Sequence, residues 1–166
     1  KTWTPIGKTN ALAYRGTFDG QSHRIKNLVI DSTEDNQGLF GFIGGGAVGA
    51  ERIKNLTIDK SCSIKGGSNV GAIAAVAFAD NANNCKVEYC ANEAAVTGKE
   101  NVGGIVGVLN NISKTVAINY CYNVGTITAE NSSAGLVGAL AVTGWKQVYF
   151  SCCYSVGAMT GSGTQY

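Results

Sequence analysis

The residue types that could cleave a polysaccharide are scattered along this sequence. Glycoside hydrolysis needs two carboxyl groups held close together, and a calcium-assisted lyase needs several oxygen ligands beside a strong base. Of the eleven acidic residues, we expect only Asp31 and Asp59 to align in successive repeats. The single histidine, His23, lies close to Asp19, which favours a turn-closing hydrogen bond over a catalytic pair. We therefore predict no enzyme and no catalytic residue, with polysaccharide lyase or hydrolase activity as the least favoured alternative.

Six cysteines are the other reactive side chains: Cys62, Cys85, Cys90, Cys121, Cys152 and Cys153. The sequence contains no Cys-x-x-Cys pair, and its single histidine cannot supply the several ligands that a metal site needs. We therefore predict no metal site and no cofactor. Cys90, Cys121 and Cys153 take a place in the repeat that leucine takes elsewhere, which indicates small buried hydrophobic side chains. Stacked on parallel strands, their Cβ atoms would lie about 4.8 Å apart, wider than a disulfide prefers. Cys152 should point to the other side and is the best candidate for a reactive thiol, while the redox state of Cys62, Cys85 and Cys152 stays open.

Aromatic residues supply the candidate binding site. Tyr122 and Tyr154 each follow a cysteine in successive repeats, and Trp145 lies in a long turn. Aromatic faces can stack on sugar rings, so we predict tentative glycan contact at these three residues. A tyrosine ladder that only stabilises the sheet is the structural alternative.

Basic residues form a predicted column beside the first strand of each repeat: Arg24, Arg52 and Lys86. This column is either a stripe for acidic glycans or a solvated face that prevents unwanted strand pairing.

Three columns of apolar residues recur about every 31 residues and must position these side chains. The first column is Leu28, Leu56, Cys90, Cys121 and Cys153. The second is Ile64, Val96, Ile127 and Met159, and the third is Leu39, Ile73, Ile105 and Leu136. Each period holds three short alternating apolar pieces separated by Gly, Asn and Ser, which is typical of strands and turns. This predicts an all-β parallel β-helix, or β-solenoid, of about five coils with three short strands each, in which stacked coils bury one another's inner faces.

Length and charge narrow the class of protein. The chain has 166 residues, a net charge of +2 and 14% charged residues, which fits one domain and argues against nucleic-acid binding. No apolar run is long enough to span a bilayer. We expect a single β-helix domain over residues 1–166, with an N-terminal coil at 1–24, repeats over 25–166 and an incomplete last coil. We also expect that it is part of a longer protein carrying the signal or anchor, and that the open last coil allows end-to-end self-association.

The glycine-flanked pieces Gly38-Leu-Phe-Gly41, Gly104-Ile-Val-Gly107 and Gly135-Leu-Val-Gly138 resemble the GLUG motif of bacterial surface proteins. The opening Trp3-Thr-Pro-Ile-Gly7 is also similar to the first coil of such arrays, whereas Ala72-Ile-Ala-Ala75 departs from the motif. The resemblance implies a right-handed β-helix in a secreted or surface-anchored, adhesin-like protein without defined catalytic residues. On this basis we predict a stiff extracellular scaffold that presents loops for contact with glycans or proteins. A carbohydrate-binding module that uses surface aromatic residues is the alternative.

Overall fold

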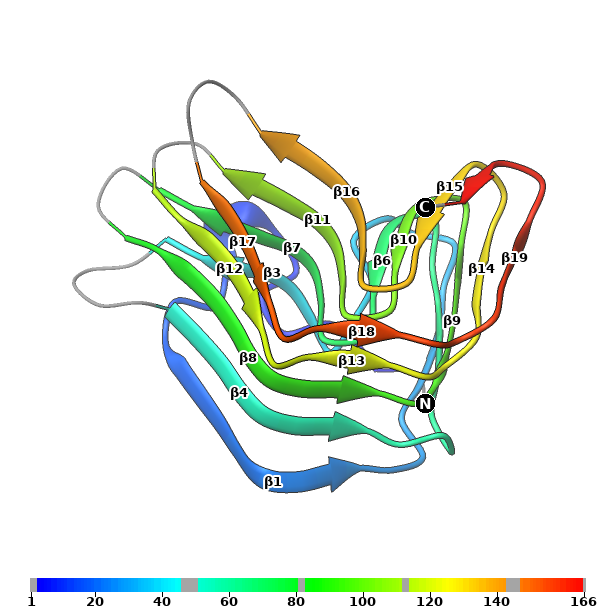
Figure 1. Cartoon of the computed structure of the whole chain (residues 1–166), viewed down its shortest axis with the longest axis horizontal. Helices are drawn as coiled ribbons and strands as arrows, with labels where there is room; N and C mark the ends of the chain where they lie inside the picture. Colours follow the sequence, from blue (N-terminus) through cyan, green and yellow to red (C-terminus); the bar gives the residue numbers. More distant parts are fainter. Residues whose placement is uncertain (1–2, 46–50, 81–82, 112–113, 143–146, 166) are drawn as a thin grey trace.

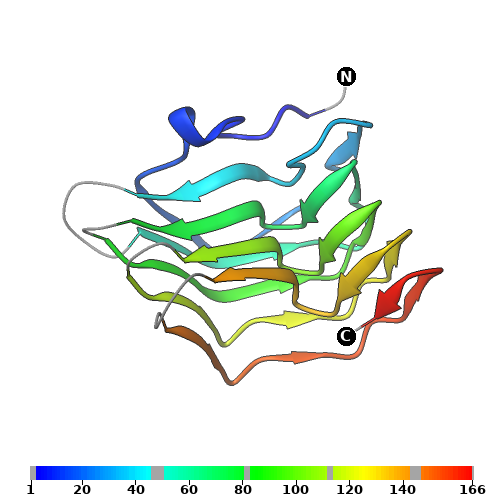
Figure 2. The same ribbon diagram turned by 90° about the horizontal axis from the view of Figure 1, so that it is seen from above.

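The computed structural model describes residues 3–45, 51–80, 83–111, 114–142 and 147–165. Within them the chain winds into stacked coils of short parallel strands, with one short 3-10 helix, η1 (Asn10–Leu12). Figure 2 shows the coils stacked from the N-terminal segment to the last coil near the C-terminus. We call the strands at one level of the stack a rung. The predicted all-β parallel solenoid is confirmed.

Four sheets run along the stack (Figure 1). The first turn has strands in sheets 1, 2 and 4, and each later full turn visits the sheets in the order 1, 2, 3 and 4. Sheet 1 contains β1 (Thr17–Ile25), β4 (Glu51–Ile58), β8 (Cys85–Asn92), β12 (Val116–Asn119), β13 (Tyr122–Asn123), β17 (Val148–Ser151) and β18 (Tyr154–Ser155). Sheet 2 contains β2 (Val29–Asp31), β5 (Ser63–Lys65), β9 (Ala95–Gly98), β14 (Ile127–Ala129) and β19 (Met159–Gly161). Sheet 1 has five rungs, so the chain makes about four complete turns.

Sheets 3 and 4 complete each coil. Sheet 3 contains β6 (Ser68–Gly71), β10 (Glu100–Gly103), β15 (Ser132–Ala134) and β20 (Thr164–Gln165). Sheet 4 contains β3 (Phe40–Gly44), β7 (Ala74–Ala79), β11 (Val106–Asn111) and β16 (Val137–Val142). The prediction of three strands per coil misses sheet 3. Its strands are short and rich in Ser, Asn and Gly, which are typical of turns, so only their pairing across the stack makes them strands.

The register confirms most of the predicted columns. The second column lies in sheet 2, where Ile64 pairs with Val96, and Ile127 pairs with both Val96 and Met159. Backbone hydrogen bonds of 3.0 Å and 2.9 Å link Ile105 to two other third-column residues, Ile73 and Leu136. These side chains form one continuous core cluster through the described rungs. Each rung therefore buries the inner face of its neighbours.

The register of the first rung of sheet 1 differs from the prediction. His23, five positions before Leu28, lies opposite Leu56, and Ile25 lies opposite Ile58 rather than Ile53. Between Asp19 and His23, β1 has three residues where β4 has only Asn55. Two of the three, Gln21 and Ser22, have positive φ and form a bulge. Leu28 instead lies beside Cys62, whose Sγ is 3.3 Å from the Leu28 amide nitrogen. The single file predicted for the first column therefore holds for Leu56, Cys90, Cys121 and Cys153, but not for Leu28.

The same shift overturns two further alignments. Asp31 pairs with Lys65 rather than with Asp59, and their side chains form an ion pair of 3.3 Å. Arg24 lies opposite Thr57, so only Arg52 and Lys86 of the predicted basic column are neighbours.

Sheet 1 bends in the middle of each later rung at a residue in the left-handed region. These residues are Asn55, Tyr89, Tyr120 and Cys152, with φ between 52° and 56°. Asn tolerates this conformation, whereas tyrosine and cysteine adopt it at a cost that the surrounding stack must offset. The bend divides the outer surface of the sheet into two facets.

The glycines of the Gly104–Gly107 segment allow close packing at the corner between sheets 3 and 4. A Cβ on Gly104 would lie 2.4 Å from Cγ of Asn123, and one on Gly107 would lie 2.7 Å from the backbone nitrogen of Val70. Neither position has room for a side chain. The spaced glycines thus bring this corner against the buried asparagine and against the rung before it.

The two ends of the stack differ. Residues 3–16 cross the first rung, where Ile6 and Tyr14 form parallel bridges to the edge strand β3. At the other end, Leu140 and Phe150 continue inner columns but are exposed. The described chain therefore covers the core at one end only.

Candidate functional site on the outer face of sheet 1

The outer face of sheet 1 carries the described residues with the most chemistry. On its first rungs these residues are charged, and on its last rungs they are tyrosines. One outer column contains Arg24, Thr57, Ala91, Tyr122 and Tyr154, each opposite the next. The same backbone positions therefore hold an ion-pair cluster at one end and an aromatic stack at the other.

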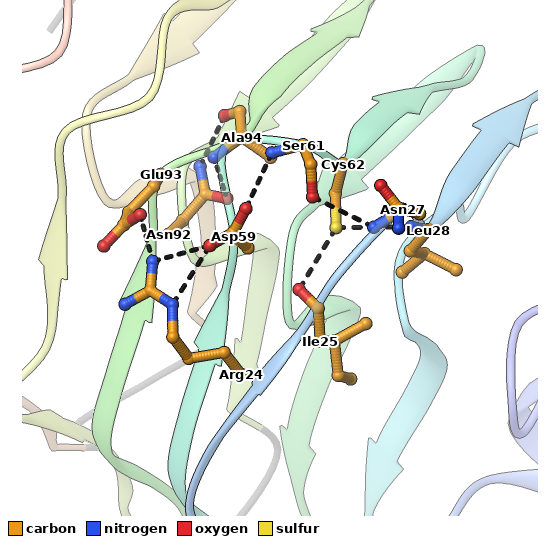
Figure 3. Close-up of polar contacts among 10 residues, drawn as sticks. All are labelled: Arg24, Ile25, Asn27, Leu28, Asp59, Ser61, Cys62, Asn92, Glu93 and Ala94. Atoms are coloured by element: carbon orange, nitrogen blue, oxygen red, sulfur yellow. Dashed lines mark hydrogen bonds and ion pairs between the residues drawn. The ribbon is translucent and has the colours of Figure 1, made fainter.

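Arg24 joins three rungs through two carboxylates (Figure 3). Its Nε and Nη2 donate hydrogen bonds of 3.0 Å and 2.9 Å to Oδ2 of Asp59, and Nη2 also contacts Glu93. Sequence analysis placed none of these residues together, because they are 35 and 69 positions apart and the bulge in β1 decides their register.

The geometry around Asp59 suits an ion-pair clamp rather than acid–base catalysis. The backbone N–H of Ser61 and then Arg24 lower the pKa of Asp59 to about 2. A general acid needs the opposite shift, toward neutral pH. Asp19 is similar: hydrogen bonds from Asn55 and the Gln21 backbone, together with Lys54 at 3.2 Å, lower its pKa to about 2. Both carboxylates remain ionised and balanced by neighbouring cations at neutral pH.

The predicted tyrosine pair is a regular stack. The rings of Tyr122 and Tyr154 lie 5.3 Å apart and within 6° of parallel. A second stack, Tyr89 on Tyr120, has centroids 4.7 Å apart and rings within 1° of parallel. Trp145, the third predicted contact residue, lies outside the described residues. The structure thus brings two of the three predicted binding residues together.

A groove lies beside the second stack. It has a volume of about 450 Å³ and is lined by Asn84, Lys86, Ala117, Asn119, Tyr120 and Tyr149, among others. Tyr149 was not predicted as a binding residue. The signal that could have revealed it is its register position, since it shares an outer column with Lys86 and Ala117.

The stacked cysteines, predicted only as small buried hydrophobic side chains, also form hydrogen bonds through their thiols. Cys90 and Cys121 are buried as predicted, and Cys153 on the last rung is partly exposed. Their thiols donate to the carbonyls of Glu88, Asn119 and Ser151, two residues earlier, at 3.2 to 3.3 Å. These carbonyls lie next to the left-handed bend, and the Ser151 carbonyl also accepts the Tyr120 N–H at 2.8 Å. Each thiol therefore adds a side-chain hydrogen bond beside the bend.

The Cys121 and Cys153 thiols have low reactivity. The adjacent Cys121 thiol and then burial raise the pKa of Cys153 above its ordinary value. Hydrogen bonding with Cys153 alone would lower the pKa of Cys121, but contact with Cys90 and burial raise it to about 12. Thiols in this state are poor nucleophiles. Cys152 is exposed, as predicted for the more accessible thiol.

A buried asparagine ladder, not predicted from the sequence, lies under the same face. Asn92 Nδ2 donates to Oδ1 of Asn123 at 2.8 Å and to the Ala94 carbonyl at 2.9 Å. Asn123 in turn bonds to Gly125 and Ser155. The ladder links successive rungs at the corner between sheets 1 and 2.

The described residues contain neither a candidate metal-binding group nor a candidate membrane-spanning helix. They contain no group of three or more His, Cys, Asp and Glu side chains arranged to hold a metal ion. They also contain no helix of the length and apolarity that crossing a membrane requires.

Comparison with known proteins gives two similarities. No family model matches the chain. Over 112 residues, or 64% of its length, the chain is 33% identical to halomucin from Haloquadratum walsbyi, of which this stretch covers 1%. It also superposes, with a TM-score of 0.59 and 17% identity, on the crystal structure of a "putative immunoglobulin A1 protease" from Bacteroides ovatus. That match covers 97% of this chain and 66% of the other, and it shows a shared fold.

Proposed function

We propose that this chain is a stiff, non-catalytic β-solenoid segment of a cell-surface or secreted protein, which holds loops and outer side chains in register for contact with other molecules. The observation that carries the proposal is the continuous core: the inner columns repeat from rung to rung, and parallel pairing links each sheet along the stack. A solenoid built this way resists bending because every rung contacts the rungs on both sides.

Side-chain ladders on several faces support this scaffold role. Asn36, Asn69 and Asn101 form amide hydrogen bonds of 2.9 Å between rungs at the start of sheet 3. In sheet 1, the cysteine, tyrosine and buried asparagine ladders also link successive rungs. We propose that the repeat is of the GLUG type, because the phased glycines meet a close-packing requirement at a recurring corner. The similarity to a protein named halomucin supports a place outside the cell.

Stretching a single molecule tests the scaffold. We expect stepwise unfolding in which each rung of about 31 residues releases on the order of 10 nm of chain. The control is Lys99→Ala, which changes an exposed side chain and should leave the steps unaltered. Smooth extension at low force, without steps, would contradict a stiff stacked structure.

Two further experiments test the location and the absence of catalysis. Antibodies raised against the chain should label intact cells of the source organism, and protease treatment of those cells should remove the label. Incubation of the purified chain with immunoglobulin A1 should leave the antibody intact, because the outer-face carboxylates Asp19 and Asp59 are committed to ion pairs. Cleavage of the antibody, abolished by denaturing the chain, would overturn the non-catalytic proposal.

End-to-end self-association remains a prediction, and the last rung gives it a physical basis. Phe150 and Leu140 lie in inner columns with no rung beyond them in the described residues. Sedimentation velocity over a range of concentrations should show association that Phe150→Asp reduces. A monomer at every concentration would exclude this mode of assembly for the isolated chain.

A further inference from the structure

The groove beside Tyr120 and Tyr149 arises from a change of side-chain size within one outer column. Ala117 of β12 lies between Lys86 of β8 and Tyr149 of β17 in the paired register. The small alanine forms part of the lining while its larger neighbours stand on either side. The groove therefore spans the last three rungs of sheet 1 rather than the gap after the final one.

Two exposed aromatic rings line this groove, and neighbouring groups restrict both. Tyr120 and Tyr149 are each 48% exposed. Tyr120 stacks on Tyr89 at 4.7 Å, and the hydroxyl of Tyr149 donates to Oε1 of Gln147 at 2.6 Å. Rings held in this way offer an apolar face with little entropy left to lose on binding.

Amide groups and one cation complete the lining. Asn84 accepts a hydrogen bond from the Thr115 N–H at 3.0 Å, and Asn119 donates to Glu88 at 3.1 Å. Each bond anchors the amide and leaves it with further donor and acceptor capacity. Lys86 is the charged residue among the described lining residues. The groove thus combines flat apolar surface, fixed amides and a positive charge.

We propose that this groove binds a carboxylated saccharide, an interaction beyond the scaffold function. The apolar face of a pyranose ring would lie on Tyr149 or Tyr120, its hydroxyl groups would bond to Asn84 and Asn119, and its carboxylate would pair with Lys86. This mixed lining matches a sugar acid better than it matches an apolar peptide, which would not use the lysine charge or the remaining hydrogen-bonding capacity of the amides. The proposed site lies apart from the Tyr122–Tyr154 stack, whose residues do not line the groove.

Titration with two probes tests the proposal: an oligogalacturonate, which carries carboxylates, and a neutral cello-oligosaccharide. We expect the wild-type chain to bind the oligogalacturonate more tightly. Tyr149→Ala should weaken that binding by about tenfold or more, as truncation of an aromatic anchor does. Lys86→Gln should remove the preference for the carboxylated probe.

Val156→Ala is the matched control, because Val156 follows β18 on the same rung and is exposed, at 73%, but lies outside the groove. It should change affinity by less than about twofold, with thermal unfolding confirming that each variant is folded. Absence of binding to both probes, equal binding of both, or an equal loss with Val156→Ala would overturn the groove as a site for sugar acids. Such a failure would leave the scaffold proposal intact, since the stretching experiment tests it separately.

Discussion

The two ends of the solenoid place similar side chains in different surroundings. At the first rung, Phe40 points inward and is fully buried, with the rings of Tyr14 and Phe18 at 5.1 Å and 5.6 Å. At the last rung, Phe150 follows Ile118 in an inner column but is 46% exposed. The comparison shows that an inward position in a repeat does not ensure burial. Burial depends on whether another layer of chain covers the rung.

The outer faces of the two ends differ in a related way. Near the covered end, Arg24, Asp59 and Glu93 neutralise one another across three rungs. Near the open end, Tyr120, Tyr149 and Tyr154 expose aromatic surface. The first group is satisfied within the molecule, whereas the second has apolar area available to a partner. Stabilisation and contact are thus concentrated at opposite ends of one sheet.

The largest predicted effect concerns the core that both ends share. Ile105 is fully buried in the middle of the stack, so Ile105→Asp would place an unpaired charge there. We expect a loss of more than about 4 kcal/mol and no cooperative folding at either end. Circular dichroism during thermal unfolding would measure it, with the exposed Lys99→Ala as the control. Equal stability of the two variants would contradict the column assignment.

Truncation of the two phenylalanines measures the difference between the ends directly. Phe40→Ala should reduce the free energy of unfolding by about 3–5 kcal/mol, because a large buried side chain is lost. Phe150→Ala should cost less than about 2 kcal/mol, because much of that ring is already in water. Urea unfolding monitored by tryptophan fluorescence gives both values. Similar losses would mean that the last rung is covered in solution.

We expect acid to destabilise the covered end of the stack before the open end. Asp19 and Asp59 have pKa values of about 2, below the ordinary 3.8, because of their hydrogen bonds and cationic neighbours. A carboxylate with a lowered pKa stabilises the fold above its unfolded pKa, and this stabilisation is lost as the pH falls from about 4 toward 2. Hydrogen exchange measured in that range should report earlier opening of β1 and β4 than of β12 and β13. Asp59→Asn should flatten the pH dependence, and an unchanged profile would argue against the clamp.

The smallest predicted effect concerns the tyrosine stack at the open end. Tyr154→Ala removes an exposed ring that contacts Tyr122, and we expect a loss of less than about 1 kcal/mol. The midpoint of thermal unfolding measures this change. A loss as large as that for Phe40→Ala would show that the tyrosines hold the fold together rather than leaving their faces for contact.

Local sequence pattern accounts for the solenoid, its period and most of its inner columns. An inward residue in a parallel stack must be apolar on every rung, and a one-residue slip would turn the strand's side chains to the opposite face. That constraint leaves a periodic signal, which is why Ile64, Val96, Ile127 and Met159 could be aligned without coordinates. Sheet 3 left no such signal, because its short polar strands resemble turns.

The sequence by itself thus determined that the chain stacks as parallel coils and which side chains fill most of the core. Tertiary structure alone decided what lies on the outer face of sheet 1. Outer positions are under no common requirement for apolarity, so their neighbours depend on the exact register between rungs. The pairing of β1 with β4 placed Arg24 beside Asp59 and Glu93, and the pairing of β2 with β5 placed Leu28 beside Cys62. The groove at Tyr149 likewise exists because three residues about 31 positions apart meet in space, with a small alanine between two large side chains.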